Sequence, residues 1–235
     1  MKLVIFDVDD TLVRSGSYED TLFWQALTDV LGLEREIFDW TNFTHVTDSG
    51  ITREVFRRQL AREPDEDALA ATERHFAGLW RDALSAVSQE EAEVPGARAL
   101  MNILLEHPQW QVALATGAWG HPAREKLAAA EIPHGDFSLG CANDAVARED
   151  IIAIAWDRAL KAADIEQFDR VVYVGDGAWD VKTCINLDLP LVGMAVREET
   201  HARLRSLGVS HILRDYKETA AVFDALEAAT PPAGA

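Results

Sequence analysis

Six short apolar runs mark the chain, and most of them show little alternation with polar residues. They span residues 3–6, 111–116, 137–141, 171–174, 191–196 and 211–213. From residue 94 onward they alternate with helical patterns at 97–106, 122–130, 149–163, 178–187, 198–207 and 218–228. Apolar runs of this kind are typical of strands buried on both faces, and their alternation with helices indicates right-handed βαβ units. The predicted fold is therefore α/β, a Rossmann-like parallel sheet with helices on both faces.

The segment between the first run and residue 94 contains no convincing strand. Its apolar spacing predicts one helix that ends at Gly32, with Ser17 as its N-cap, a second over residues 51–61, and a third after Pro64. We therefore predict an α/β catalytic core made of residues 1–14 and 93–235, with an all-helical cap inserted at residues 15–92. An insertion beside the strand ends of a sheet is a candidate lid.

Charge and cysteine content narrow the possible partners. Acidic residues outnumber basic ones by 40 to 22, a net charge of −18, which repels nucleic acids and anionic membranes. The only two cysteines, Cys141 and Cys184, form no CxxC pair and suit a reducing compartment as buried small hydrophobes. We expect no signal-peptide core and no membrane span. The sequence thus predicts a cytoplasmic protein, a monomer or homodimer, with neither a nucleic-acid nor a membrane partner.

Acidic residues follow two of the predicted strands, at the edge where open parallel sheets bind ligands. Asp7 and Asp9 follow the first strand, where one side chain and one backbone carbonyl can face a common hard cation. Asp176 follows the fourth strand as a further candidate ligand, and Asp180 one turn later could orient a ligand or a metal-bound water. The alternatives are a solvated acidic turn for the first pair and a helix N-cap for the second.

Candidate phosphate contacts follow the other two strands. Thr116 and Gly117 offer a hydroxyl and free backbone N–H groups, a pattern that is also typical of a simple turn. Arg148 stands where a helix begins after the third strand, and its guanidinium fork suits phosphate. The alternative for Arg148 is an ordinary exposed arginine. A substrate that is itself an anion needs such a local cluster, or a metal, to overcome the field of this acidic chain.

The four candidate sites follow successive strands of one predicted sheet. This arrangement resembles that of the haloacid dehalogenase-like hydrolase superfamily, and the resemblance covers nearly the whole chain. The DxDxT motif matches Asp7, Asp9 and Thr11, the hydroxyl residue after the second strand matches Thr116, and GDxxxD matches Gly175, Asp176 and Asp180. Residues 116–127 and 47–51 resemble the phosphoglycolate-phosphatase-like branch, which carries a helical cap after the first motif. Two positions depart from that pattern: Arg148 replaces a lysine, and His45 stands where related cap loops often have glycine.

The resemblance implies a Mg²⁺-dependent phosphatase acting on a small-molecule phosphate ester such as phosphoglycolate or a sugar phosphate. It implies that Asp7 attacks phosphorus and forms an aspartyl-phosphate. Asp9 would protonate the leaving oxygen and then take a proton from the hydrolytic water. The Mg²⁺ ligands would be Asp7, the backbone carbonyl of Asp9, and Asp176. Thr116, Gly117 and Arg148 would hold the phosphoryl oxygens, with Thr47 and Asp48 of the cap near the leaving group.

Two other functions remain open at this point. A phosphomutase of the same fold would return the phosphoryl group to a sugar instead of water. A non-enzymatic phosphate-binding or interaction module would keep the fold with impaired chemistry, and Arg148 is the sequence feature that hints at it.

Overall fold

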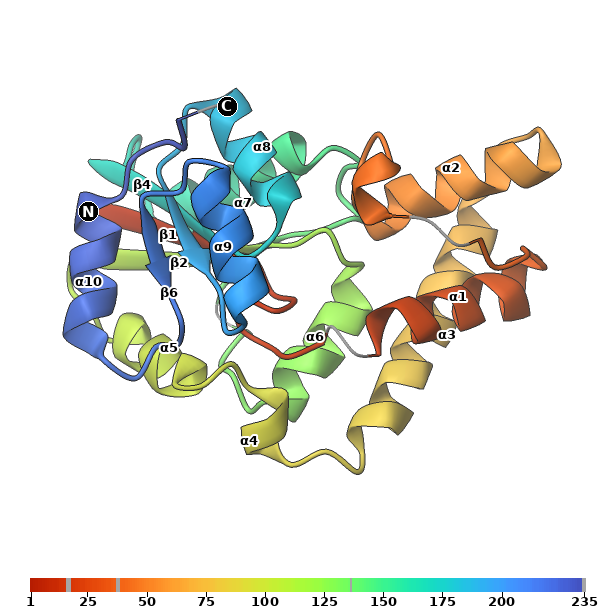
Figure 1. The fold of residues 1–235 in the computed structure, drawn as a ribbon, viewed down its shortest axis with the longest axis horizontal. Coiled ribbons are helices and arrows are strands. Elements are labelled where there is room, and N and C mark those ends of the chain that lie inside the picture. Colours follow the sequence, from red (N-terminus) through yellow and green to blue (C-terminus); the bar gives the residue numbers. More distant parts are fainter. Residues whose placement is uncertain (16–17, 37–38, 136, 234–235) are drawn as a thin grey trace.

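The computed structural model describes residues 1–15, 18–36, 39–135 and 137–233, and contains one six-stranded parallel sheet in the order β3-β2-β1-β4-β5-β6 (Figure 1). The strands are β1 (Lys2–Phe6), β2 (Trp110–Ala115), β3 (Ser138–Gly140), β4 (Arg170–Gly175), β5 (Leu191–Met194) and β6 (His211–Leu213). Phe6 at the end of β1 is level with Leu114 of β2 and Val174 of β4. The segments that follow these three strands therefore emerge together at one edge of the sheet.

Both faces of the sheet are buried, as the uniformly apolar strands predict. Along β1, Val4 and Phe6 point into one hydrophobic cluster while Leu3 and Ile5 point into the other. The first cluster includes residues of α5 (Ala97–Leu105), α6 (Gly120–Ala129) and α10 (Thr219–Ala228). The second includes residues of α7 (Arg148–Ala163), α8 (Ala178–Leu187) and α9 (Glu198–Ser206). The α/β architecture predicted from the sequence is confirmed.

A group of helices follows β1 and lies beside the sheet in Figure 1. It consists of α1 (Glu19–Leu31), the 3₁₀ turn η1 (Trp40–Asn42), α2 (Asp48–Leu60) and α3 (Glu66–Leu84), before the short α4 (Gln89–Ala92) leads back. Phe23, Val55, Phe76 and Trp80 belong to a third hydrophobic cluster, which Trp119 joins from the sheet side. These helices thus have their own core and share part of it with the rest of the chain.

The chain leaves and re-enters the sheet region at one point. The Arg14 N–H donates to the Ala92 carbonyl at 2.8 Å, and the Val94 N–H donates to the Leu12 carbonyl at 2.9 Å. Gly32 adopts a left-handed conformation at the end of α1, where the sequence predicts the helix stop. The predicted cap residue Ser17 lies outside the described residues. The η1 turn and α4 were not predicted, since neither is long enough to show a helical period. Within the described ranges, no helix combines the length and apolarity that crossing a bilayer requires.

Candidate active site

Three acidic side chains meet at the sheet edge after β1 and β4. Asp7 follows β1, and its N–H donates to the Val174 carbonyl at 2.9 Å, which fixes the two strand ends against each other. One carboxylate oxygen from each of Asp7, Asp176 and Asp180 lies within 4.8 Å of the other two. The predicted meeting of these acids at one edge therefore occurs in the fold.

Burial and the repulsion between neighbouring carboxylates raise the pKa values of Asp7 and Asp176. Burial raises the pKa of Asp7 to about 8, with a further rise caused by Asp180, while Arg148 works in the opposite direction. Burial, followed by the charges of Asp180 and Asp10, also raises the pKa of Asp176 well above its ordinary value. Asp7 Oδ1 is buried and has no hydrogen-bond partner among the described residues. An unpartnered Asp7 oxygen close to further carboxylates that repel it is a donor set that fits a hard divalent cation such as Mg²⁺.

Asp180 differs from the other two because the protein already occupies its oxygens. Its Oδ2 accepts the Gly177 N–H at 2.9 Å, which caps α8, and its Oδ1 accepts the Tyr173 hydroxyl at 3.3 Å. Arg148 Nη1 donates to the same Oδ1 at 2.9 Å. Asp180 therefore links the start of α8 to Arg148.

Arg148 reaches the acidic site from the first turn of α7. Its Nη1 lies 3.9 Å from Asp7 Oδ1, and its Nε donates to the Val46 carbonyl at 3.0 Å. Gly117 is needed beside it, because a Cβ atom there would come within 2.5 Å of Arg148 Nη2. The guanidinium thus joins the sheet edge to the segment before α2, and it is not an ordinary surface arginine.

Of the two predicted phosphate contacts after β2, only Gly117 lines the large cavity described below. Thr116 is buried, and its Oγ1 accepts the Ala118 N–H at 3.1 Å. Its hydroxyl therefore holds the turn after β2 in shape.

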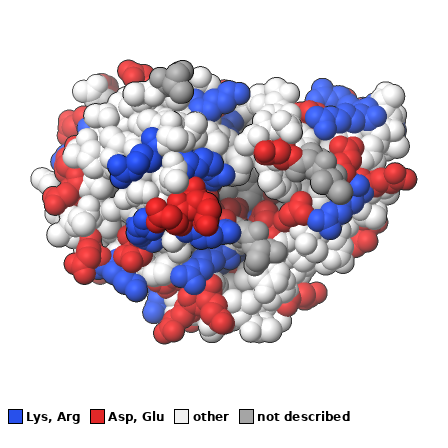
Figure 2. Space-filling view, viewed as in Figure 1, with Lys and Arg blue, Asp and Glu red and all other residues white. Residues whose placement is uncertain are grey.

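A cavity of about 340 Å³ lies between the sheet edge and the helical group, and we call it the central cavity. From the sheet side it is lined by Asp7, Asp9, Gly117, Arg148 and Asp176, and from the helical side by Glu19, Phe23, Trp40, Thr47 and Asp48, among others. Figure 2 shows this hollow between the two parts of the molecule, with acidic atoms inside it and Lys and Arg side chains nearby on the sheet side. Apart from Thr116 and Asp180, the candidate site residues from both parts of the sequence therefore line the same space.

The predicted cap residues contact the sheet side directly. Thr47 caps α2 by accepting the Gly50 N–H, and its hydroxyl donates to the Val146 carbonyl at 2.9 Å. The Asp48 N–H donates to the Gly117 carbonyl at 2.8 Å, and Asp48 Oδ2 accepts the Trp119 N–H at 2.8 Å. Burial raises the pKa of Asp48 to about 7, against the opposing effect of Lys126.

Lys126 is a residue of this site that the sequence reasoning considered only as a substitute cation for Arg148. Its side chain, on α6, is fully buried, and its Nζ donates to Asp9 Oδ1 at 2.7 Å and to Glu19 Oε2 at 2.8 Å. Burial alone would lower the pKa of Lys126, but the neighbouring carboxylates, Asp9 foremost, raise it above its ordinary value. No local spacing signals this cluster, because its members come from distant parts of the chain.

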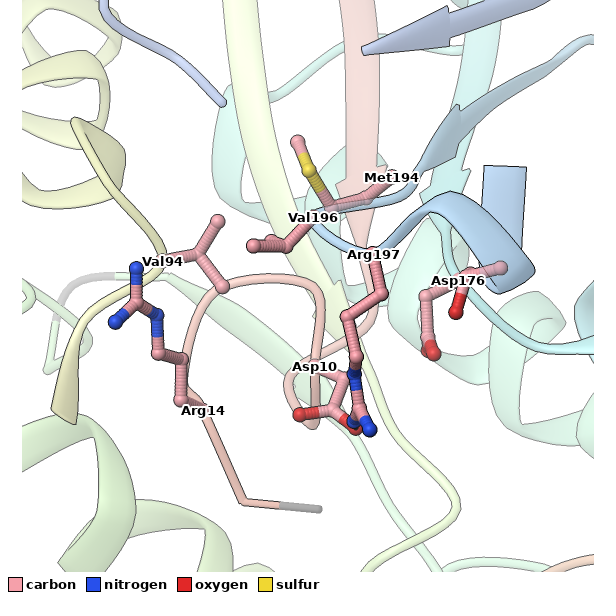
Figure 3. Close-up of a pocket in the computed structure, with 8 residues that line it drawn as sticks. Asp10, Arg14, Val94, Asp176, Met194, Val196 and Arg197 are labelled. Carbon is pink, nitrogen blue, oxygen red and sulfur yellow. The ribbon is translucent and has the colours of Figure 1, made fainter. Parts of the chain in front are cut away.

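A second hollow of about 240 Å³ adjoins the central cavity at Asp10 and Asp176 (Figure 3). There the Arg197 guanidinium points toward Asp10, with Nη2 3.7 Å from the carboxylate Oδ2. Asp10 and Arg197 also line the central cavity. The acidic strand ends are thus reached from two adjoining spaces.

Comparison with known proteins connects this geometry to a family. A family model for haloacid dehalogenase-like hydrolases matches residues 1–188. Among curated proteins, no sequence matches this chain.

Solved structures share the fold over nearly the whole chain. A hydrolase from Pseudomonas syringae aligns with a TM-score of 0.65 at 17% identity, over 95% of this chain and 98% of that one. A β-phosphoglucomutase from Clostridium difficile gives a TM-score of 0.65 at 11% identity, over 96% of both chains. CbbY from Rhodobacter sphaeroides, solved in complex with phosphate, gives 0.57 at 17% identity, over 92% of this chain and 95% of that one. At such identities the likeness is one of fold.

Proposed function

This chain belongs to the haloacid dehalogenase-like hydrolases, and on that premise we propose that it is a Mg²⁺-dependent phosphatase of small organic phosphate monoesters, working through an aspartyl-phosphate. The observation that carries the proposal is Asp7. Its buried carboxylate lines the central cavity, one of its oxygens lacks a hydrogen-bond partner among the described residues, and a half-buried arginine stands beside it. An acid held in this way is available to attack phosphorus.

The reaction divides between the two acids after β1. Asp7 forms a bond to phosphorus while the bond to the ester oxygen breaks, and Asp9 gives its proton to that oxygen so that an alcohol departs. Asp9 then takes a proton from the water whose oxygen attacks phosphorus, and the bond to Asp7 breaks. The products are an alcohol and inorganic phosphate, and both acids return to their starting states.

The proposed metal ligands are Asp7, the backbone carbonyl of Asp9, and Asp176. When bound, Mg²⁺ supplies positive charge between the carboxylate nucleophile and the phosphate dianion. The closeness of the carboxylates of Asp7, Asp176 and Asp180, and the raised pKa values of all three, support a cation here. Asp180, whose oxygens already accept protein hydrogen bonds, is proposed to orient the site instead of binding the ion.

Arg148 and Gly117 are proposed to receive the phosphoryl oxygens, with a guanidinium fork and a backbone N–H respectively. Thr116 is also proposed as a phosphate contact through its hydroxyl, which accepts the Ala118 N–H inside the turn and still has its own proton to donate. Residues 15–92 are proposed to act as a cap, which shields the reaction from water and selects the leaving group through Thr47 and Asp48. Their contacts with the Val146 and Gly117 carbonyls support this placement.

A panel of phosphate esters assayed with Mg²⁺ tests the proposal, with phosphoglycolate and a hexose phosphate among its members. Release of inorganic phosphate by the wild type, and none by Asp7→Asn, is expected. Conversion of the hexose phosphate to an isomer without phosphate release would instead identify a phosphomutase. No turnover of any ester would favour a phosphate-binding module.

A further inference from the structure

Lys126 is a fully buried cation between the sheet and the helical group. It lies on α6, which packs against α3, and its Nζ is 4.5 Å from the centroid of the Trp80 ring and 5.9 Å from that of Phe76. Lysine is almost never fully buried without partners, because moving an ammonium group out of water is unfavourable. Such a residue requires a reason beyond filling space.

The reason is found in its two hydrogen bonds. One goes to Asp9 in the loop after β1, at 2.7 Å, and the other to Glu19 in the first turn of α1, at 2.8 Å. One ammonium group thus binds the proposed proton donor of the core and a residue of the proposed cap at the same time. The three groups are brought together only by the fold, since Asp9 and Glu19 lie 117 and 107 residues from Lys126.

The contact also distinguishes the two oxygens of Asp9. Lys126 binds Oδ1, whereas Oδ2 accepts no hydrogen bond from the described residues. Asp9 lines the central cavity, and its side chain remains 24% exposed, so it is not held in place by packing alone. A charged hydrogen bond to Oδ1 fixes the carboxyl group and leaves Oδ2 for the leaving oxygen.

We propose that Lys126 is a positioning residue, which holds Asp9 for proton transfer to the leaving group and couples that placement to the seating of α1 through Glu19. This inference rests on the phosphatase function proposed above. Lys126 keeps its own three protons throughout. The proton moves from Asp9 Oδ2 to the ester oxygen as the phosphorus–oxygen bond breaks, and it is replaced by a proton from the hydrolytic water.

The test compares two esters that differ in their need for a proton. A simple alkyl phosphate has a poor leaving group that must be protonated, whereas a nitrophenyl phosphate departs as a stable phenolate. Lys126→Met removes the charge and keeps the chain length. We expect it to reduce kcat/KM for the alkyl ester by about 10- to 100-fold, the value of one charged hydrogen bond, and to reduce it far less for the aryl ester. Asp9→Asn should show the same preference for the aryl ester, to a greater degree.

Arg81→Met is the matched control. Arg81 on α3 binds Glu125, the neighbour of Lys126 on α6, so this variant also breaks an ionic contact between the helical group and α6. Glu125 and Arg81 do not line the central cavity. The control should therefore leave kcat/KM for both esters unchanged.

Two further variants keep the proposal testable if Lys126→Met does not fold. Lys126→Arg retains the charge with a displaced donor, and Glu19→Gln retains the bond between Lys126 and Asp9 while weakening the bond to α1. Both variants should lower kcat/KM more for the alkyl ester than for the aryl ester. Of the two, Glu19→Gln should have the smaller effect on kcat. Equal losses for both esters in every folded variant would overturn the positioning role while leaving the phosphatase function intact. A wild type inactive on both esters would overturn both proposals.

Discussion

Replacement of Arg148 is the sharpest test of how the site holds phosphate. The guanidinium donates to Asp180 Oδ1 at 2.9 Å and to the Val46 carbonyl at 3.0 Å, and it lies 3.9 Å from Asp7 Oδ1. Arg148→Ala removes at least one charged hydrogen bond to the transferred group, a loss of about 1.5–3 kcal/mol. We expect kcat/KM to fall by about one to two decades on every phosphate ester, since the phosphoryl group is common to all of them.

Arg148→Lys separates charge from geometry. A lysine Nζ keeps the charge but carries all of its donors on one atom, so it does not reproduce the separate Nη1 and Nε donors that reach Asp180 and the Val46 carbonyl. We expect this variant to recover part of the activity lost in Arg148→Ala. The part it does not recover measures the contribution of the planar fork.

The assay is steady-state hydrolysis of an alkyl and an aryl ester in Mg²⁺, together with inhibition by inorganic phosphate. The control is Arg158→Ala, which removes another arginine of α7 that binds Asp144 at 2.6 Å on the surface. Thermal unfolding of each variant accompanies the kinetics, because leaving the buried Asp180 without its partner costs about 3–5 kcal/mol of stability. Activity of Arg148→Ala equal to that of the wild type would refute the phosphate role assigned to this residue.

Three other substitutions address the nucleophile, the turn after β2 and the proposed cap. Asp7→Asn, or removal of Mg²⁺ with EDTA, should abolish phosphate release, because an amide is a poor nucleophile and a poor ligand for a hard cation; undiminished release would contradict the mechanism. Gly117→Ala places a Cβ 2.5 Å from Arg148 Nη2 and 2.9 Å from the Val46 carbonyl, so KM should rise in a folded protein, and unchanged kinetics would count against that crowding. Asp48 has its pKa raised to about 7 in the folded state, so the stability it contributes at low pH is lost as the pH rises through 7. Between pH 5 and pH 8, metal-free wild type should therefore lose about 2–3 kcal/mol more stability than Asp48→Asn in urea unfolding, and parallel losses would show that Asp48 does not titrate there.

The sheet and its acidic edge could be predicted because both depend on short-range patterns. A strand buried on both faces reads as a continuous apolar run, and β1 meets this requirement by sending Val4 and Phe6 to one face and Leu3 and Ile5 to the other. In a parallel sheet all strands end at the same edge, so residues that follow different strands become neighbours wherever they stand in the sequence. Asp7 and Asp176 were found by this rule, which needs no knowledge of the side-chain directions.

Side-chain direction is what the sequence could not supply. The pair Thr116 and Gly117 was predicted as a joint phosphate cradle, and only the structure shows that Gly117 lines the central cavity while the buried Thr116 hydroxyl accepts the Ala118 N–H within the turn. Lys126 lies on a helix whose other charged residues, such as Arg124 and Glu125, are partly exposed, and nothing in that segment marks it as buried. Its burial depends on the rings of α3 and on carboxylates contributed by two other segments of the chain.

Each of the two acids after β1 has its own cation, Arg148 beside Asp7 and the buried Lys126 beside Asp9. Arg148 lines the central cavity, where the phosphoryl group is proposed to bind, whereas Lys126 binds Asp9 and Glu19 of the helical group. A loss of Arg148 should therefore act on the group that every substrate shares, and a loss of Lys126 on the part in which substrates differ. In a chain with a net charge of −18, placing each cation against one acid supplies positive charge where an anionic substrate must bind. The same arrangement ties each cation to the helical group, Arg148 through the Val46 carbonyl and Lys126 through Glu19, so that seating of these helices and alignment of the acids depend on the same contacts.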